Sequence, residues 1–274
     1  MNNSLKIIAW NVNGVRAVAN KNPNEMKRLI KDNDPDIVIW NEIKGNESMQ
    51  VATQKLMDET IPGFKWYWNN SERPGYAGVC ISIKPHINVL SVDYGLNSVK
   101  KESEGRILTI ELEKCYVVGV YVVNAGEKDL KRLQYKLEWM ANLALHLDDL
   151  KQKSPHKAVI LMGDLNIAPM NVDIHNPKRN QKSAGFTQEE RDCFEWFKQR
   201  GWVDVYRSKY PNSVEYTYFS IKARAKERNA GWRIDLTILD QASYNKIGVQ
   251  NIDSRILGDY NASDHCPILL DILL

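Results

Sequence analysis

Polar side chains stand at the ends of several apolar segments of this sequence, in a pattern that could do chemistry. The apolar run 159–162 has the composition of a buried strand and ends at Gly163, after which Asp164 and Asn166 follow at alternate positions. Successive side chains of an extended segment point to opposite sides, so we expect these two to face one small target together. Similar positions beside other apolar runs are occupied by Asn11, Asn13, Glu42, Tyr121, Asp235, Asp264 and His265. If these strand ends share one edge of the fold, their side chains line one pocket.

The donor atoms of this set suit a hard divalent cation. Oxygen ligands without paired cysteines favour Mg²⁺ or Mn²⁺, which keeps several waters and takes one or two protein carboxylates. Hydrolysis of a phosphate ester needs such a cation, a carboxylate that orients or deprotonates water, and a proton-bearing group near the scissile phosphate. Glu42, Asp164 and His265 could fill these three roles. Asp235 could fix the tautomer of His265 and favour its charged form.

Each of these residues also has a structural explanation when it is taken alone. An Asp or Asn after a strand commonly forms an Asx turn. His265 could be a hydrogen-bonded structural residue, Tyr121 a half-buried strand aromatic, and Trp232 a core residue. The catalytic hypothesis therefore depends on the recurrence of polar residues at strand ends, not on any one of them.

Composition excludes some classes of protein. The chain has 274 residues, 43% of them apolar, with no apolar stretch long enough to span a membrane and no signal peptide at its start. Its four cysteines show no C-x-x-C spacing, which argues against a zinc site or a disulfide framework. We therefore expect a soluble protein that is not secreted. The net charge of +3 is too small to indicate a nucleic-acid partner by itself.

Basic residues gather in two segments, at 176–182 and at 222–228, and aromatic residues flank the second. Basic groups interleaved with aromatics could bind phosphates and stack or wedge against bases. Either segment alone is more simply a solvated loop. The candidates for phosphate contacts are Lys178, Arg179, Lys182, Arg224 and Lys226.

The periodicity of the chain predicts more strands than helices. Strands are expected at 5–10, 37–40, 63–68, 78–83, 106–112, 116–123, 159–162, 203–206, 216–219, 233–239 and 266–273. Helices are expected at 23–33, 47–59, 129–150 and, from the capping-box spacing of Thr187 and Glu190, through 199. Several strands follow one another through short turns, which favours mixed or antiparallel sheets with helices on their outer faces. No break in composition divides residues 1–274, so one domain is expected. The absence of a glycine-rich phosphate loop argues against nucleotide-cofactor chemistry.

The residues at the strand ends lie in motifs that resemble the exonuclease III family of apurinic/apyrimidinic (AP) endonucleases, within the endonuclease/exonuclease/phosphatase superfamily. The resemblance covers nearly the whole chain. GDLN at 163–166 and SDH at 263–265 are shared across the superfamily, whereas NPK at 176–178, GFT…ER at 185–191 and GWRID at 231–235 are typical of the DNA-repair branch. The other matching segments are WNVNGVR at 10–16, PDI…NEIK at 35–44, GYAGV at 75–79, EGR at 104–106 and YVVNAG at 121–126.

This resemblance implies a four-layered α/β/β/α sandwich of two facing mixed sheets flanked by helices. It implies a Mg²⁺-dependent enzyme, with Mn²⁺ as an alternative, that incises duplex DNA 5′ to an abasic site and leaves a 3′-hydroxyl. Phosphodiesterase activity at 3′ ends and 3′→5′ exonuclease activity often accompany that reaction. The expected state is a monomer without a membrane, in a prokaryotic cytoplasm or another compartment that holds DNA, and without a separate N-terminal regulatory module.

The resemblance also implies a role for each matching residue. Glu42 would hold the metal, assisted by Asn13 and Asp264. Asp164 would orient or activate the water, with Asn166 beside it. The scissile phosphate would be contacted by His265, paired with Asp235, and by Asn11, Tyr121 and Asn124. Trp232 and Tyr218 would line a pocket for the flipped-out abasic sugar, from which an intact nucleotide is excluded because its base collides with the aromatic wall.

Some positions depart from the usual pattern of the family. Asn41 and Ile43 stand in a segment that usually reads Gln-Glu-Thr-Lys, Val123 replaces a frequent proline, and Tyr218 and Phe219 replace a bulkier aromatic pair. Deaminated bases or 3′ ends therefore remain alternative preferred substrates. A phosphatase of inositol lipids or small phosphate esters is a second hypothesis, and a catalytically silent binding module is a third. The basic segments favour a duplex, and none of the expected catalytic residues is missing.

Overall fold

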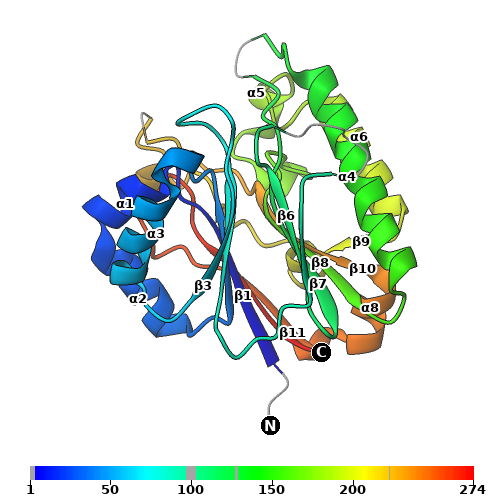
Figure 1. The fold of residues 1–274 in the computed structure, drawn as a ribbon. Helices are drawn as coiled ribbons and strands as arrows, with labels where there is room; N and C mark the ends of the chain where they lie inside the picture. The colour runs from blue at the N-terminus through cyan, green and yellow to red at the C-terminus, as the bar shows by residue number, and fades with distance from the viewer. Residues whose placement is uncertain (1–3, 97–102, 127–128, 222) are drawn as a thin grey trace.

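Two facing β-sheets with helices on their outer faces make up the protein in the computed structural model, which describes residues 4–96, 103–126, 129–221 and 223–274 (Figure 1). Within the described residues each sheet has six strands. Apolar side chains fill three layers: one between the sheets and one between each sheet and its helices. The predicted four-layered α/β/β/α sandwich is confirmed.

The first sheet is centred on β1 (Ser4–Asn11), whose buried side chains face both neighbouring layers. β1 pairs in parallel with β2 (Ile37–Asn41) and antiparallel with β12 (Ile268–Leu273). β4 (Val79–Ile83) and β3 (Lys65–Asn69) extend the sheet beyond β2, and β11 (Ile252–Ile256) borders β12. The helices α1 (Val15–Lys21), α2 (Pro23–Asn33) and α3 (Glu47–Thr60) cover its outer face.

The second sheet is centred on the parallel pair β7 (Cys115–Tyr121) and β8 (Ala158–Asp164). β6 (Ile107–Glu111) and β5 (Ser91–Tyr94) lie beyond β7, and β10 (Asp235–Asp240) and β9 (Trp202–Asp204) lie beyond β8. The outer face is covered by α4 (Leu133–Lys153) and α6 (Gln188–Gln199), and α8 (Gln241–Ile247) follows β10. The predicted capping box at Thr187 and Glu190 is present, and it begins α6.

Some predicted elements differ from the structure. The expected strand at 203–206 ends at Asp204, because the Asp204 carboxylate accepts a hydrogen bond from the backbone N–H of Arg207 and begins α7 (Val205–Lys209). The expected strand at 216–219 forms only isolated bridges, through Tyr218 to Trp232 and His265. α4 begins at Leu133 rather than 129, and residues 127–128 lie outside the described part of the chain. Sequence periodicity missed α1, α8, β5 and β11, which are short.

A close approach of β7 and β8 sets the position of the Asp164 end of β8. A Cβ atom at Gly163 would lie 2.1 Å from the carbonyl oxygen of Val120, so only glycine fits there. The Asn41 side chain crosses from the first sheet to the second and donates a 2.9 Å hydrogen bond to the same carbonyl. Asn41 is fully buried. The two sheets are thus joined directly beneath the strand ends that carry the polar residues.

The long connection between β8 and α6 is anchored by buried charges. Asp173 is fully buried and accepts hydrogen bonds from Nε of Arg233 at 2.6 Å and from Arg207. Arg233 also donates to Asp204 at 2.7 Å. The short helices η1 (Asn171–Asp173) and α5 (Pro177–Asn180) lie on this connection. The loop is therefore fixed at its base by a charged cluster, while its tip lies beside the polar strand ends.

Replacing Arg233 with methionine should destabilise the protein strongly. The change removes the Arg233 cation and leaves the carboxylates of Asp173 and Asp204 buried. Loss of one partner of a buried ion pair lowers the free energy of unfolding by about 3–5 kcal/mol. Urea unfolding followed by circular dichroism measures the loss. Arg255→Met is the control, because Arg255 pairs with Asp253 on the surface and should cost less than about 1 kcal/mol. Equal losses in the two variants would contradict the prediction.

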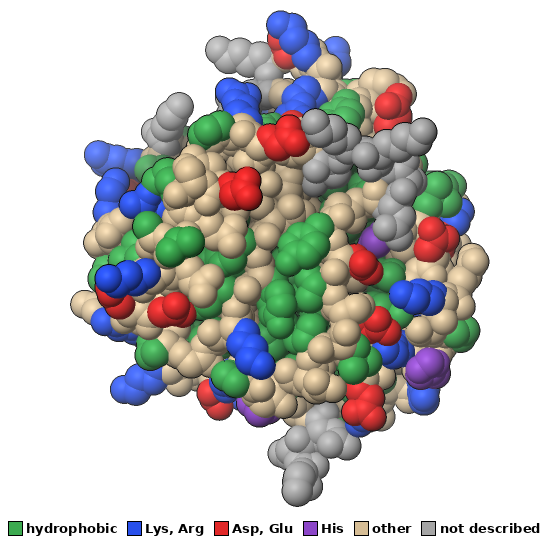
Figure 2. Space-filling view, viewed as in Figure 1, with side chains coloured by type: hydrophobic (Ala, Val, Ile, Leu, Met, Phe, Trp, Pro, Cys, Tyr) green, Lys and Arg blue, Asp and Glu red, His purple; other side chains and the backbone are tan. Residues whose placement is uncertain are grey.

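The surface charge and the helices can be compared with two sequence predictions: a small net charge, and no segment that spans a membrane. On the face seen in Figure 2, acidic and basic side chains are interspersed around a strip of hydrophobic ones, in keeping with the small net charge. Basic side chains are also seen at the upper end of that view. Among the described helices, none combines the length and the apolar character that crossing a membrane requires.

Candidate active site

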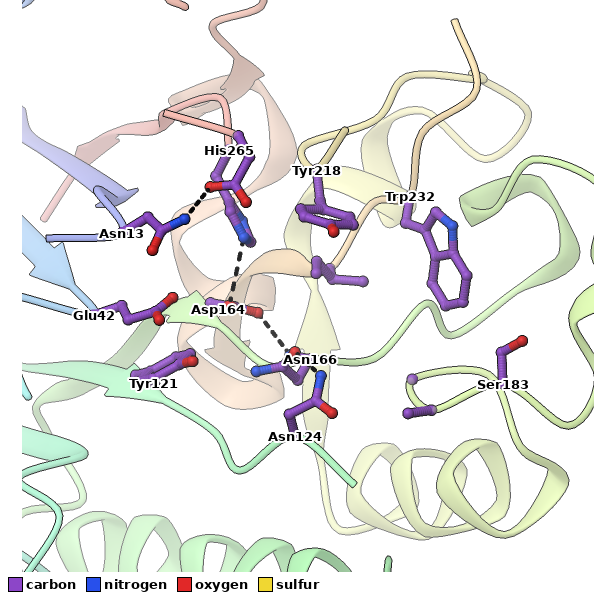
Figure 3. Close-up of a pocket in the computed structure, with 14 residues that line it drawn as sticks. Asn13, Glu42, Tyr121, Asn124, Asp164, Asn166, Ser183, Tyr218, Trp232 and His265 are labelled. Atoms are coloured by element: carbon purple, nitrogen blue, oxygen red, sulfur yellow. Dashed lines mark hydrogen bonds and ion pairs between the residues drawn. The ribbon is translucent and has the colours of Figure 1, made fainter. Parts of the chain in front are cut away.

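The predicted site residues meet at one edge of the two sheets, around a cavity of about 360 Å³ (Figure 3). The carboxyl ends of the parallel strands β1, β2, β7 and β8 reach this edge, and the antiparallel strands β10 and β12 begin there. The predicted residues that line the cavity are Asn13, Glu42, Tyr121, Asn124, Asp164, Asn166, Tyr218, Trp232, Asp264 and His265. Sequence reasoning gave no role to the other lining residues, Ser183, Ala184, Gly185 and Ile234, although all four lie in or beside a matching motif.

Asp164 ends β8 and is 1% exposed, so its carboxylate is held almost wholly by protein groups. One oxygen accepts a 2.8 Å hydrogen bond from the backbone N–H of Asn166, and the other accepts one of 2.9 Å from the Asn11 side chain. Burial and the nearby Asp235 raise the pKa of Asp164 to about 7, although His265 opposes the shift. A carboxyl group with a pKa near neutrality is suited to accept a proton from water.

His265 is paired with Asp235 in the same buried cluster. Its Nδ1 lies 2.8 Å from Oδ2 of Asp235, and its Nε2 faces Asp164 at 3.9 Å (Figure 3). Burial alone would lower the pKa of His265, but the charge of Asp235 and the hydrogen bond to it raise the pKa to about 10. The imidazole is therefore charged at neutral pH. It can donate a hydrogen bond from Nε2 to an anionic group in the cavity.

Asn166 lies beside Asp164 for a different reason from the one predicted. Its backbone is left-handed, with φ of +51°, so the two residues do not alternate along one extended segment. The structural alternative is also correct, since Asp164 accepts the Asx-turn hydrogen bond from Asn166. The Asn166 side chain donates to the carbonyl oxygen of Val122 at 2.8 Å and accepts from Asn124 at 3.0 Å. The turn brings both side chains to the cavity.

Glu42, Asn13 and Asp264 bring further oxygen atoms to the cavity, and Glu42 lies next to Asp164 (Figure 3). Nδ2 of Asn13 donates to Asp264 at 3.1 Å, and Nδ2 of Asn11 donates to Glu42 at 3.2 Å as well as to Asp164. The Lys44 ammonium lies 3.1 Å from Oε1 of Glu42 and also donates to Oδ1 of Asn13. The Lys44 ammonium therefore contacts oxygen atoms of two of the three predicted metal ligands. Carboxylate and amide oxygens that accept a cation in this way fit Mg²⁺ or Mn²⁺.

A second group of potential ligands needs a different interpretation. Among the described residues, Asp164, Asp235 and His265 offer ligand atoms within 4.8 Å of one another. Nδ1 of His265 is already bonded to Asp235, so the remaining ring nitrogen is Nε2, which faces Asp164. We call these three residues the acid–base cluster, and we call the side with Glu42, Asn13 and Asp264 the predicted metal side.

Tyr121 presents a neutral phenol to the cavity. Burial and the carboxylates of Glu42 and Asp164 raise its pKa well above the ordinary value, although Arg106 opposes this. The guanidinium of Arg106 lies 4.7 Å from the Tyr121 ring centroid and donates to the Tyr121 carbonyl at 3.0 Å. Arg106 is almost fully buried and has no role in the sequence prediction. The one sequence feature that could have pointed to Arg106 is its place in the EGR motif at 104–106.

Two aromatic rings form one wall of the cavity. The Tyr218 ring centroid lies 4.9 Å from that of His265, and Trp232 lies beside Tyr218 (Figure 3). Backbone hydrogen bonds of 2.8 and 2.9 Å join Tyr218 to Trp232. Both side chains are partly exposed. The structure therefore brings the predicted pocket residues to the cavity, although neither belongs to a regular strand.

The predicted DNA-contact residues have different environments. Lys178, Arg179 and Lys182 are exposed and immediately precede the cavity-lining Ser183. The Lys226 ammonium instead donates to the carbonyl oxygens of Gly258 at 2.8 Å and Tyr260 at 3.1 Å. Arg224 is exposed on the neighbouring turn, and Lys222 lies outside the described residues. DNA contacts by these side chains stay a prediction.

Residues 8–265 match the model of the Endonuclease/Exonuclease/phosphatase family. An exodeoxyribonuclease of Bacillus subtilis is 36% identical over 269 residues, which cover 98% of this chain and 99% of the relative. The crystal structure of an AP endonuclease from Leishmania major superposes with a TM-score of 0.88 at 26% identity, over 99% of this chain and 88% of that one. A 3′ phosphatase from Neisseria, solved with a product DNA hairpin, gives a TM-score of 0.82 at 26% identity, over 98% and 99% of the two chains.

The cavity at the strand ends, its acid–base cluster and its oxygen ligands thus coincide with a match that extends over almost the whole chain. The chain belongs to the endonuclease/exonuclease/phosphatase family, in the branch of the AP endonucleases and exodeoxyribonucleases.

Proposed function

We propose that this protein is a Mg²⁺-dependent DNA-repair phosphodiesterase that incises duplex DNA on the 5′ side of abasic sites. The same site would also remove blocking groups and nucleotides at 3′ ends. One observation carries the proposal: a single cavity joins an acid–base cluster, oxygen ligands for a divalent cation and an aromatic wall. By their names, one relative is an exodeoxyribonuclease and another is a DNA-(apurinic or apyrimidinic site) endonuclease, and the structural neighbours include an AP endonuclease and a 3′ phosphatase.

The geometry supports hydrolysis by direct attack of water. Asp164 would hold the water and accept its proton, and Asn166 would help to orient it. The new bond joins the water oxygen to phosphorus, and the bond from phosphorus to O3′ breaks. O3′ takes up a proton from solvent, which leaves a 3′-hydroxyl and a 5′-phosphate. His265 and Tyr121 would donate hydrogen bonds to the phosphate oxygens, whose negative charge grows during attack. A divalent cation held by Glu42, Asn13 and Asp264 would supply further positive charge there.

The aromatic wall supports a preference for abasic sites. A flipped-out sugar without a base would fit between the phosphate site and the rings of Tyr218 and Trp232, whereas a base would collide with them. The exposed Lys178, Arg179 and Lys182 would bind the duplex backbone beside the cavity. We expect the protein to act as a monomer, since these elements all come from one chain.

The test uses a duplex oligonucleotide with one tetrahydrofuran abasic analogue, with Mg²⁺ and separately with Mn²⁺. Undamaged, uracil-containing and 3′-phosphate-ended duplexes are assayed alongside it. We expect incision at the analogue to give a product that a polymerase can extend from its 3′-hydroxyl. Equal rates on the undamaged duplex would refute the abasic preference. Cleavage restricted to 3′ ends would identify the protein as an end-processing enzyme.

Shortening Trp232 to alanine should weaken the discrimination against intact nucleotides. Removing the indole opens the wall that would meet a base, so the ratio of kcat/KM on abasic to undamaged duplex should fall about tenfold. Trp196→Ala is the matched control, because Trp196 is 40% exposed on α6 and does not line the cavity. The prediction fails if both variants keep the ratio of the unmodified protein.

A further inference from the structure

A buried ion pair lies behind the cavity, between α4 and α6. Nζ of Lys136, on α4, is 2.5 Å from Oε1 of Glu190, on α6. Each residue is 1% exposed, although the surrounding residues of both helices pack as an apolar layer on the second sheet. Neither side chain lines the cavity. A pair of opposite charges at this depth therefore needs an explanation other than contact with a substrate.

The pair is bonded to the backbone on two sides of the cavity. Nζ of Lys136 donates a 2.6 Å hydrogen bond to the carbonyl oxygen of Asn166. The Glu190 carboxylate accepts from the backbone N–H of Gly185 at 2.8 Å, and from both the N–H and the hydroxyl of Thr187. One end of the pair thus holds the turn that carries Asp164 and Asn166. The other end holds the segment that includes Gly185.

Gly185 itself fills the narrow space between these two parts of the site. Its φ is +86°, and a Cβ there would lie 3.0 Å from the carbonyl oxygen of Asn166 and 3.4 Å from Cζ3 of Trp232. The Gly185 carbonyl oxygen also accepts a 2.8 Å hydrogen bond from Ala168. A side chain at this position would therefore crowd both the indole and the turn that carries Asp164 and Asn166. The hydrogen bond from Gly185 to Glu190 fixes the backbone at this close approach.

Stability alone does not account for the pair. Apolar side chains of similar volume often replace a buried ion pair with no loss of stability. Such side chains could not, however, bond the Asn166 carbonyl or the Gly185 N–H, two backbone groups that face opposite parts of the site. What this pair does, and an apolar pair could not do, is bond both of these backbone groups.

We propose that Lys136 and Glu190 are positioning residues that hold the catalytic turn and the Gly185–Trp232 wall at a fixed separation. This separation sets how strongly the enzyme discriminates abasic from intact nucleotides. The inference rests on the proposed function for its substrate, but the arrangement of the backbone does not depend on it.

The test variant is Lys136→Met with Glu190→Met, which removes both charges together with the bonds to the Asn166 carbonyl, Gly185 and Thr187. Its matched control is Lys157→Met with Glu111→Met. Lys157 lies 2.7 Å from Glu111 and likewise donates to a backbone carbonyl, that of Leu112, but at the opposite end of β8 from the cavity. Both variants lose a buried or half-buried lysine–glutamate pair, so the thermal midpoint of each reports any general loss of stability.

Three readouts separate positioning from mere stability. In the test variant we expect kcat on the abasic analogue to fall about tenfold with little change in KM, because misplacement of the reacting groups affects the chemical step. The ratio of abasic to undamaged cleavage should fall by a similar factor. Hydrogen exchange of the backbone at 183–187 should accelerate. The control variant should keep the discrimination ratio and the exchange rate at 183–187.

The inference is overturned if the folded test variant keeps both the discrimination ratio and the exchange rate at 183–187 of the unmodified protein. If the unmodified protein does not cleave the abasic duplex, the proposed function is refuted instead. In that case the exchange rates alone decide whether the pair holds the wall. Equal acceleration of exchange in both variants would also overturn the inference, because it would show a general loosening of the fold.

Discussion

Asp164→Asn should reduce kcat on the abasic-site duplex by about 10³-fold, a loss typical of the removal of a general base. Asparagine keeps the shape of the side chain and the oxygen that accepts from the Asn166 N–H, so the turn should be unchanged. It cannot accept a proton from water. KM should change little, since Asp164 would act on the attacking water more than on the bound duplex. Single-turnover cleavage of the abasic analogue measures the effect.

The stability of this variant should move in the opposite direction from its activity. Because the pKa of Asp164 is raised to about 7 in the folded protein, the fold disfavours the ionised carboxylate. Above pH 7 that unfavourable charge is present, and the neutral amide removes it. At pH 8 the variant should therefore unfold at an equal or higher temperature than the unmodified protein. Asp253→Asn, at a partly exposed ion pair, is the control. Full activity of Asp164→Asn would eliminate this mechanism.

Removal of divalent cations should also abolish cleavage. Stabilisation of developing charge by a metal ion contributes several kcal/mol, so EDTA should lower the rate by about 10³-fold or more. Added Mg²⁺ or Mn²⁺ should restore it. Glu42→Gln should raise the Mg²⁺ concentration needed for half-maximal activity, because the variant loses the negative charge on the metal side of the cavity.

Glu47→Gln provides the control for Glu42→Gln, since Glu47 is on α3 and outside the cavity. It should leave the Mg²⁺ dependence unchanged. Isothermal titration with Mg²⁺ in the absence of DNA gives a second, activity-independent measurement of the same site. Cleavage at the same rate with and without EDTA would show that no divalent cation takes part.

The location of the site could be predicted from sequence because its residues follow a simple pattern. Parallel strands bring their carboxyl ends to the same edge, so the polar residues after β1 and β2 lie together in the first sheet, and those after β7 and β8 lie together in the second. The sequence prediction assumed that these two edges meet, and the structure shows that they do. Antiparallel strands that begin at that edge add Asp235 and His265. Neither conclusion required knowledge of side-chain packing. The succession of strands and helices indicated mixed sheets with helices on their outer faces, and the family resemblance gave the four-layered sandwich.

The supporting contacts could not be predicted in this way. Lys136 occurs in a helix with many charged residues, where a lysine ordinarily faces solvent, and only the structure shows that it is buried. Glu190 was expected as a capping residue. Its other carboxylate oxygen, however, accepts from Lys136 on α4, which lies 54 positions earlier in the chain. Lys226 looked like part of a basic surface, whereas its ammonium holds the carbonyls of Gly258 and Tyr260. Such long-range contacts leave no periodic signal.

The bridge from Asn41 to the carbonyl oxygen of Val120 has a mechanical consequence. The cavity is divided between the sheets: Glu42 follows a strand of the first, and Asp164 ends a strand of the second. Sliding of one sheet over the other would change the spacing between Glu42 and Asp164 directly. The hydrogen bond of Asn41 opposes such sliding, because it joins the two sheets directly beneath the cavity. Core substitutions that let the sheets slip should therefore impair catalysis before they lower the melting temperature.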